Sequence, residues 1–363
     1  MTAAIRIVAP GLLTSIQDIG RHGHQRFGIP VSGACDRVCL AAANVLVGNT
    51  PGAAALEIAY QGPTIVIEAD SVRVAYAGGN ATIDIIPEDG GTAERLPPYE
   101  SRRLQRGQTI RVGALSGSAV GYLAIEGGFD IPPFAGSQST FTRAGFGGWK
   151  GRPLTAGDVV PLKLADVETR EESKLPPLDL APPPRIRVVL GPQDDYFSEA
   201  GIRTFLEADY TVTQSSDRMG MRLDGAHLEH SRGFNIVSDG IAPGAIQVPG
   251  TGLPIILLAD RQTTGGYPKI ATVVSADLPA LGRLSPGARI AFEAVDIETA
   301  EALRAGMMAL IDGLSARMMP VAHVATIDET KLLSCNLISG VVNAAKPPDS
   351  DLALWHDPDT AAS

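Results

Sequence analysis

Cysteine is scarce in this sequence, which has 3 cysteines among 363 residues. An odd and low count gives no disulfide framework and suits a reducing compartment. Cys35 and Cys39 are spaced to share one face of a helix, but no histidine lies near them in the sequence. We therefore expect them to be small buried apolar side chains and not part of a metal or redox site.

Long apolar runs are also missing. The longest run, around Pro254–Ala259, is far too short to span a bilayer, and the N-terminus MTAAIRIVAPG lacks a secretory core. The formal net charge of -10 repels the phosphate backbone of nucleic acids. We expect a cytoplasmic protein whose partners include neither a membrane nor a nucleic acid.

Several well-known catalytic motifs do not occur. The sequence has no G-x-x-x-x-G-K-[ST] phosphate loop and no G-x-S-x-G nucleophile elbow. His22 and His24 are not accompanied by H-E-x-x-H or C-x-x-C, so no metal site is expected. The glycine-rich GFGGWKG fits neither a dinucleotide nor a kinase spacing, and a turn-rich hairpin is its expected structure.

The residues that are present favour a β-rich fold. Hydrophobic residues make up 44% of the chain and charged residues 19%, which is enough apolar surface for large cores. The 40 glycines and 27 prolines separate short β-rich runs, as in an all-β barrel or sandwich. The expected strands are Ile5–Val8, Thr64–Glu68, Val72–Tyr76, Thr82–Ile86, Thr109–Gly113 and Val120–Ile125.

Three helices are expected among these strands. The first begins after Asp36, a suitable N-cap, and ends at Gly48. The second covers Asp194–Glu207. The third and longest covers Glu298–Arg317, where leucine and methionine recur at helical spacing.

A charged and proline-rich segment over residues 165–184 divides the chain and predicts an extended spacer. The expected organisation is an N-terminal β-barrel subdomain over 1–165, a Pro-rich linker over 166–184, a C-terminal β-barrel subdomain over 185–295, and a helix with a C-terminal extension over 296–363. In that extension, KLLSCNLISGVV is apolar enough to dock on another surface. The last stretch, from Lys346, is expected to be loose.

The two parts of the chain resemble copies of one unit. GLLTSIQD parallels VVLGPQDD, VSGACDR parallels TQSSDRMG, and LQRGQTIRV parallels LSPGARIAF. The order is the same and the offset is roughly 180 residues each time, as in an internal repeat. Two such units leave a cleft between them, and clefts between domains are common ligand sites.

Four segments gather polar residues and glycines that a core does not need: IQDIGRHGHQRFGIPVSGACDR, GSQSTFTRAGFGG, TQSSDRMGMR and ADRQTTGGYPK. Before the fourth, the apolar strand PIILLAD ends in Asp260 and Arg261. Ionisable groups at the end of a buried strand are costly unless they are paired or used, so an ion pair and a functional pair both remain open. For Asp36–Arg37 and Asp217–Arg218, capping or bracing of a loop is favoured.

These segments supply carboxylates, amides, hydroxyls and guanidinium groups. Such a set suits recognition of a small planar amide or a carboxylate, because arginine offers bidentate contacts. Fixed donors of this kind also stabilise a developing oxyanion. Asp260 is the candidate general base.

The same segments resemble the allophanate hydrolase subunit 2 family. The matching stretches lie within residues 5–295 and include GLLTSIQDIGRHGHQRFGIPVSGACDR, FTRAGFGGWKGRPLTAGD, SSDRMGMRL and GAIQVPGTGLPIILLADRQTTGGYPKIATV. The resemblance implies a mostly β fold of two cyclophilin-like β-barrel subdomains with a few peripheral helices. This fold agrees with the repeat.

The resemblance also implies function. Stand-alone members look like the C subunit of 5-oxoprolinase, which acts with A- and B-type subunits to open the lactam of 5-oxoproline to L-glutamate, using ATP that this chain or a partner binds. The first alternative is a carboxyltransferase subunit of a biotin-dependent urea or amide carboxylase, with carboxybiotin carried by a partner. The second is a non-catalytic regulatory protein that binds a partner of the B type, itself a kinase inhibitor.

Both enzymatic hypotheses require oxyanion donors and a carboxylate base. We expect Asp260 to be the base, and Arg261 and Lys269 to hold anions. The expected substrate-binding residues are Gln247, Gln262, Thr263, Thr264, Asp217, Arg218 and Ser216. We expect the loop after Leu258 and the loop before Met219 to face each other in a groove between the two barrels.

Overall fold

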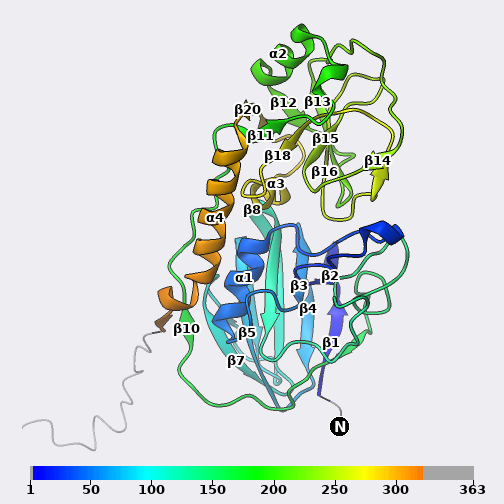
Figure 1. Ribbon diagram of the computed structural model, residues 1–363. Helices are drawn as coiled ribbons and strands as arrows, with labels where there is room; N and C mark the ends of the chain where they lie inside the picture. Colours follow the sequence, from blue (N-terminus) through cyan, green and yellow to red (C-terminus); the bar gives the residue numbers. More distant parts are fainter. Residues whose placement is uncertain (1–2, 322–363) are drawn as a thin grey trace, which may run out of the picture. The chain divides into compact units, whose positions relative to one another are not determined.

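The computed structural model describes residues 3–321, and two large antiparallel-rich sheets dominate them (Figure 1). One sheet is built from residues 4–161 and the other from residues 186–294. They form a half-barrel and a nearly closed barrel, so the predicted mostly β fold is confirmed. We call residues 3–165 the N-terminal half and residues 185–321 the C-terminal half. The apolar segment KLLSCNLISGVV and the stretch from Lys346 lie outside the described residues.

The N-terminal sheet has nine strands, ordered β2-β3-β8-β4-β1-β9, with β5 pairing with β8, β7 and β6. In β1, Ile5 and Ile7 are buried and Arg6 between them is partly exposed, as alternation along a strand requires. The strands are β1 (Ala4–Ala9), β2 (Leu13–Gln17), β3 (Ala55–Ala59), β4 (Thr64–Ile67), β5 (Ser71–Ile86), β6 (Glu94–Arg95), β7 (Ser101–Gln105), β8 (Thr109–Ile125) and β9 (Val159–Pro161).

The two longest strands correct the predicted boundaries. Val72–Tyr76 and Thr82–Ile86 belong to one strand, β5, and the two runs expected near residues 109–125 belong to β8. The glycines between the runs do not end the strands, because β5 and β8 pair along most of their length and shift register at Gly78 and again after Ala81. Gly78 has φ +136, which a side-chain-bearing residue rarely adopts. Glycine marks a bulge here and not a turn.

Helix α1 (Arg37–Leu46) covers one face of this sheet and confirms the first predicted helix (Figure 1). Asp36 is the N-cap, and its side chain accepts hydrogen bonds from the backbone N–H of Val38 and Cys39. Nearly every residue of α1 is buried, in a core shared with β5, β8 and α4 (Ile297–Asp312). Cys39 is fully buried in this core, as expected for a small apolar side chain.

The C-terminal sheet has eight strands in the order β19-β12-β13-β16-β15-β18-β11-β20. Its core contains the stacked rings of Phe205 and Phe292, with Tyr210 beside them. The strands are β11 (Ile186–Leu190), β12 (Tyr210–Val212), β13 (Gly220–Gly225), β15 (Ala245–Gln247), β16 (Ile255–Leu257), β18 (Lys269–Val273), β19 (Arg289–Ile290) and β20 (Phe292–Ala294). Two small ribbons pair β10 (Ser173–Lys174) with β21 (Met319–Pro320) and β14 (Asp239–Gly240) with β17 (Thr264–Gly265).

The helices of the C-terminal half differ from the prediction at their ends. Residues 194–196 form a separate 3-10 turn, and α2 (Glu199–Glu207) begins only after its N-cap Ser198. The long helix α4 ends at Asp312, and a 3-10 turn over 315–317 follows it. The short helix α3 (Leu278–Arg283) was not predicted. Within residues 3–321 no helix combines the length and the apolar character needed to cross a membrane.

The predicted repeat is not reproduced at the paired Asp–Arg positions. Asp36 caps a helix, whereas Asp217 accepts hydrogen bonds from Met219 and Gly220 in a turn before β13. Both aspartates accept hydrogen bonds from backbone N–H groups, but one lies at a helix N-terminus and the other in a turn. The proposed subdomain boundaries stay a prediction.

Candidate functional site

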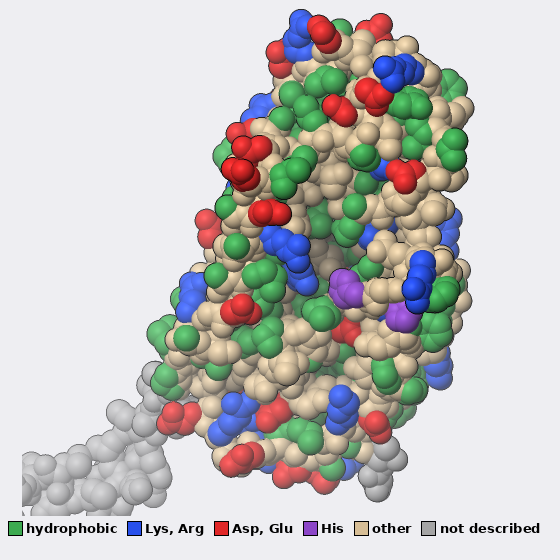
Figure 2. Space-filling model, in the orientation of Figure 1, with side chains coloured by type: hydrophobic (Ala, Val, Ile, Leu, Met, Phe, Trp, Pro, Cys, Tyr) green, Lys and Arg blue, Asp and Glu red, His purple; other side chains and the backbone are tan. Residues whose placement is uncertain are grey.

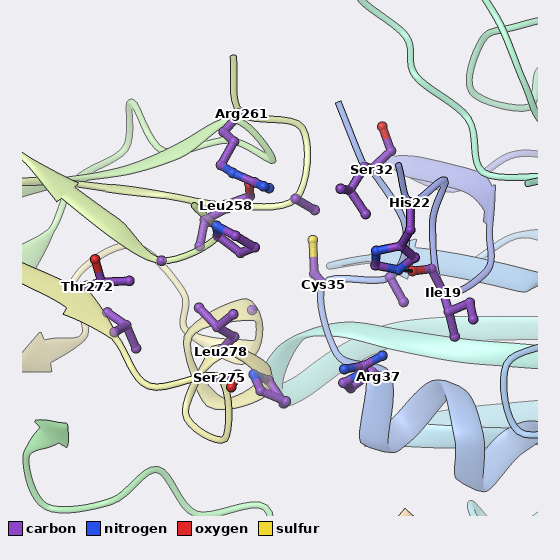
Figure 3. A pocket seen from close by; sticks show the side chains of 18 of the residues that line it. Ile19, His22, Ser32, Cys35, Arg37, Leu258, Arg261, Thr272, Ser275 and Leu278 are labelled. Atoms are coloured by element: carbon purple, nitrogen blue, oxygen red, sulfur yellow. Dashed lines mark hydrogen bonds between the residues drawn. The ribbon is translucent and has the colours of Figure 1, made fainter. Parts of the chain in front are cut away.

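A cavity of about 420 Å³ lies where the two halves meet, and residues of both halves line it (Figure 3). On the surface, a hollow bordered by Lys or Arg and by His side chains is visible on the face shown in Figure 2. The polar and charged lining residues are His22, Ser32, Cys35, Arg37, Arg261, Thr272, Ser275 and Arg304. We refer to this cavity as the interface pocket.

The loop between β2 and α1 forms one wall of the interface pocket. Its Ser32 N–H donates to the carbonyl of Ala259 at 3.1 Å, which ties the loop to the segment after β16. Gly33 has φ +88, and a Cβ at this position would lie 2.8 Å from the backbone N of Gly20. Only glycine therefore allows the loop to fold back on itself beside the pocket.

The ionisable groups that line the interface pocket are basic, apart from the thiol of Cys35. Arg261 is 2% exposed; its Nε donates to the carbonyl of Ile241 at 3.2 Å and its Nη1 to that of Leu258 at 3.3 Å. Its Nη2 has no hydrogen-bond partner among the described residues. Burial lowers the pKa of Arg261 to about 10, so the side chain is still charged at neutral pH.

Arg37, at the start of α1, extends the positive charge of the pocket. Burial and the nearby Arg304 of α4 lower the pKa of Arg37, because two positive groups repel each other. Neither Arg37 nor Arg261 forms an ion pair with a carboxylate in the described part of the chain. Figure 3 shows Arg261 on one side of the pocket and Arg37 and His22 on the other.

Beside the pocket, Arg218 holds two carboxylates from different halves. Its Nε lies 2.8 Å from Asp260 Oδ2 and its Nη2 lies 3.2 Å from Oδ1, while Nη1 pairs with Glu57 of β3. Arg218 Nη2 also donates to the carbonyl of Gly33 at 2.7 Å. Burial opposes the charge of Arg218, but the carboxylates of Asp260 and Glu57 outweigh it and raise its pKa well above the ordinary value.

Glu57 connects this ion pair to the cap of α1. Its Oε2 accepts hydrogen bonds from the hydroxyl of Tyr122 at 2.6 Å and from Cys35 N at 2.8 Å. The Tyr122 oxygen in turn accepts from Asp36 N at 2.8 Å. Arg283 of α3 pairs with the other side of Asp36 at 2.6 Å. The partly buried Arg218 and the buried Arg283 of the C-terminal half are thus bound to two buried carboxylates of the N-terminal half.

The structure brings together the two loops that were expected to face each other. Asp260 N donates to the carbonyl of Arg218 at 2.8 Å, and the two side chains form an ion pair. Both carboxylate oxygens of Asp260 are engaged by this guanidinium, and Asp260 does not line the interface pocket. Ser216 lies in the turn before β13, where its hydroxyl accepts from Arg222 N at 3.1 Å. The chemical roles expected for these residues stay predictions.

The other expected site residues form a second polar cluster. Lys269 is buried and its Nζ lies 2.7 Å from Asp239 Oδ2. Gln262 Nε2 donates to Gln247 Oε1 at 3.3 Å. The Thr263 carbonyl accepts a backbone hydrogen bond from Ile241, and Thr264 lies in the ribbon strand β17. None of Lys269, Gln247, Gln262, Thr263 and Thr264 is among the residues that line the interface pocket.

Several residues that line the interface pocket are not among the site residues expected from the sequence. His22, Ser32, Cys35 and Arg37 lie within the first polar segment, so the density of polar residues in that segment indicated part of the pocket. Arg304 lies on the long helix α4, where an isolated arginine resembles any solvated residue. Glu57 could have been noticed as an ionisable residue inside the apolar strand ALEIA, since such a group requires a partner.

The side chains that line the interface pocket favour binding of an anion over nucleophilic or metal-dependent chemistry. Burial raises the pKa of the Cys35 thiol far above neutral, which disfavours the thiolate needed for nucleophilic attack. Within residues 3–321 no group of three His, Cys, Asp or Glu side chains is arranged to hold a metal ion. Arginine side chains and a serine hydroxyl are donors suited to a carboxylate or another small anion.

Comparison with known proteins places the chain in a family. The family model described as "Carboxyltransferase domain, subdomain A and B" matches residues 27–294. The chain is 36% identical over 302 residues to the C subunit of 5-oxoprolinase from Escherichia coli, covering 83% of this chain and 94% of that protein. It is 33% identical to urea amidolyase of Saccharomyces cerevisiae, covering 91% of this chain but only 19% of that protein.

A solved structure agrees with this relationship. The crystal structure of the Kluyveromyces lactis urea amidolyase superimposes with a TM-score of 0.77 at 30% identity. The match covers 88% of this chain and 21% of that one, so the chain corresponds to about a fifth of the yeast enzyme. The fold of most of this chain is therefore shared with that part of the yeast enzyme. This chain belongs to the carboxyltransferase domain family, subdomain A and B.

Proposed function

We propose that this chain is the C-type component of an ATP-dependent 5-oxoprolinase, a cytoplasmic complex that opens the lactam of 5-oxoproline to L-glutamate. The observation that carries the proposal is the match to a stand-alone C subunit of 5-oxoprolinase along 94% of that protein's length. The match to urea amidolyase, in contrast, covers 19% of a much larger protein.

The interface pocket supports a small, negatively charged substrate. Its volume of about 420 Å³ suits a single small ring, and its ionisable lining is basic apart from the thiol of Cys35. In this proposal Arg261 holds an anion and Ser32 provides a hydroxyl donor toward the amide. Arg218 and Asp260 position the loops on either side, because each is already held by the other.

The proposal assigns ATP and part of the chemistry to partner subunits of the A and B types. The donors of the interface pocket are side chains suited to one carboxylate, and the sequence contains no Walker-type loop to surround a triphosphate. We therefore place ATP in one of these partners. Lys269, Gln247, Gln262, Thr263 and Thr264 remain candidates for contact with a partner-bound group.

Reconstitution of the complex tests this function. The chain is purified with its candidate A- and B-type partners, and L-glutamate released from 5-oxoproline is measured with and without ATP. We expect release only when all three proteins and ATP are present. ATP-dependent release by the partners alone, unchanged when this chain is added, would contradict the proposal.

A carboxyltransferase subunit is the second candidate, because the family model that matches residues 27–294 is named for that activity. Under this hypothesis a partner carries carboxybiotin, and the interface pocket accepts urea or a related amide. The test combines the chain with biotin-dependent partners and measures bicarbonate- and ATP-dependent carboxylation of urea. Carboxylation in this assay, with no glutamate release in the first, would favour the second candidate.

A further inference from the structure

The interface pocket contains positive charge that the described chain does not neutralise. Of the other buried arginines in the described residues, Arg73 binds Glu126 and Glu172 and Arg283 binds Asp36, whereas Arg21 has no carboxylate within ion-pair distance. Arg261 is buried to the same extent, but it contacts two carbonyl groups and no described carboxylate. A buried cation without a counter-ion is costly, so a ligand that supplies the negative charge would stabilise it.

Two buried polar atoms of pocket residues lack a hydrogen-bond partner among the described residues, and they indicate which groups the ligand carries. Arg261 Nη2 is an N–H donor without a partner among the described residues, and Ser32 Oγ is a buried hydroxyl that also lacks one there. Both residues line the pocket, and Figure 3 shows them on facing sides of it. A buried donor left unsatisfied costs free energy until it is hydrogen-bonded. Both atoms have almost no accessible surface, so a ligand with two acceptors reaches them only through a small shift of these side chains.

The basic side chains differ in exposure. Arg261 is buried, Arg37 is partly buried, and Arg304 and His22 are exposed at the pocket. Positive charge thus extends from the surface to the innermost cation. Such a gradient attracts an anion from solvent and favours its transfer to the buried position. The remaining wall is largely apolar, including Ile19, Leu258 and Leu278, and would pack against a compact ring.

We propose that the interface pocket is a carboxylate-specific site in which Arg261 binds the carboxylate of a small cyclic amide acid and Ser32 bonds to the same ligand. This inference rests on the proposed function and names the part of the substrate that is recognised. The lactam ring lies against the apolar wall, and Arg37 and Arg304 assist entry. Specificity comes from Arg261, because its free N–H would be left unpaired by a ligand without the carboxylate.

Direct binding to the full chain tests the inference without requiring turnover. Three ring compounds are titrated calorimetrically: 5-oxoproline, 2-pyrrolidinone, which lacks the carboxylate, and cyclopentanecarboxylate, which lacks the amide. We expect 5-oxoproline to bind most tightly, cyclopentanecarboxylate to bind measurably, and 2-pyrrolidinone to bind at least about 10-fold more weakly than 5-oxoproline, the loss expected for one charge-assisted contact. The affinity for the two acids should fall as salt is raised.

Variants assign the contact. Arg261→Gln should weaken the binding of both acids by about 10- to 100-fold and leave the weak binding of 2-pyrrolidinone unchanged. Arg261→Lys should restore part of the affinity. The matched control is Arg289→Gln, an exposed arginine of β19 outside the pocket, which should bind all three compounds as the unmodified chain does. If Arg261→Gln does not fold, Arg37→Gln should still weaken the binding of both acids and reduce its salt dependence.

Several outcomes would overturn the inference. These are equal affinity for 5-oxoproline and 2-pyrrolidinone, no binding of either acid by the full chain, or unchanged acid binding in folded Arg261→Gln. Failure of the reconstituted complex to release glutamate would instead count against the proposed function. Acid binding that depends on Arg261 would then still support an anion site in this pocket.

Discussion

Arg283 of α3 donates a hydrogen bond of 2.6 Å from Nη1 to Oδ2 of Asp36, the residue that caps α1. The same carboxylate therefore satisfies the first turn of a helix in the N-terminal half and neutralises a cation from the C-terminal half. Arg283 is 9% exposed and Asp36 is fully buried. With Arg218 and Glu57, this pair joins the two walls of the interface pocket.

Asp36→Ala should lower the free energy of unfolding by about 3–5 kcal/mol, because it removes the cap and leaves Arg283 buried without its partner. The matched control is Asp296→Ala, which removes the exposed cap of α4, where Asp296 Oδ1 accepts from Thr299 N at 2.8 Å. The control should lose only about 1 kcal/mol. Urea unfolding followed by circular dichroism measures both. Equal losses would show that the Arg283 pair adds nothing to the cap.

The acid sensitivity of the fold should depend on Asp158. Hydrogen bonds from Arg152, together with those from Thr155, hold the pKa of Asp158 far below its usual range. A carboxylate with a lowered pKa in the folded state stabilises the fold above its unfolded-state pKa of about 3.9, and this contribution is lost as the pH falls toward the folded-state value.

Asp158→Asn should therefore be less stable than the unmodified chain near neutral pH, by about 1.5–3 kcal/mol for the lost charged hydrogen bonds. Between about pH 5 and pH 2 its unfolding free energy should also fall less steeply. Urea unfolding across this range compares the two slopes. Parallel curves would mean that Asp158 does not contribute to the pH dependence.

The sequence was sufficient for features that depend on neighbouring residues. The cap at Asp36 and the apolar run after it predicted α1, and the strand PIILLAD predicted that Asp260 and Arg261 emerge where a buried strand ends. The convergence of Asp260 with Arg218 also followed from their two polar loops. These signals are local, or they follow from the need to pair buried charges.

The sequence was insufficient where distant residues decide the structure. The glycines near residue 78 separate two expected strands in the sequence, yet pairing with β8 keeps β5 continuous through a bulge. Arg37 and Arg304 share the interface pocket although they are far apart in the chain, and no local pattern connects them. Lys269 was grouped with Arg261 by proximity in sequence, but their side chains contact different partners.

Cys35 should be unreactive although it lines the pocket. Burial raises the pKa of its thiol, and the nearby Arg218 lowers it by a smaller amount. Reaction with a thiol reagent requires the thiolate, so labelling near pH 8 should be much slower than that of glutathione. The measurement uses a Cys335→Ser variant, because Cys335 lies outside the described residues. Both remaining thiols should react once guanidinium chloride unfolds the chain, and rapid labelling of one thiol in the folded chain would contradict the expectation.

Two glycine substitutions should have opposite effects on stability. A Cβ at Gly121 of β8 would overlap the hydroxyl oxygen of Tyr76, so Gly121→Ala should destabilise the fold by about 1–3 kcal/mol. A Cβ at Gly306 of α4 would meet nothing within 4 Å, and its backbone is helical. Gly306→Ala should therefore stabilise the fold by about 0.5–1 kcal/mol. Thermal unfolding of the pair measures both effects, and a destabilised Gly306→Ala would reveal an unrecognised contact of α4.

Lys269 and Asp239 form an ion pair in the second polar cluster. Lys269 is 2% exposed and paired with Asp239, whose side chain is half exposed and has its pKa lowered mainly by the hydrogen bond from Lys269. Lys269→Met keeps the length of the side chain and leaves Asp239 in contact with water. If the pair is structural, the variant complex should keep its KM for 5-oxoproline.

If Lys269 instead binds an anionic group of the substrate, Lys269→Met should raise KM at least about 10-fold. The loss of a charge-assisted hydrogen bond costs about 1.5–3 kcal/mol. Asp239→Asn separates the two cases, because it frees Lys269 without removing its charge. A structural pair gives both variants nearly normal KM values. A substrate-binding lysine gives a raised KM only when Lys269 itself is replaced, which would return this residue to the role expected from the sequence.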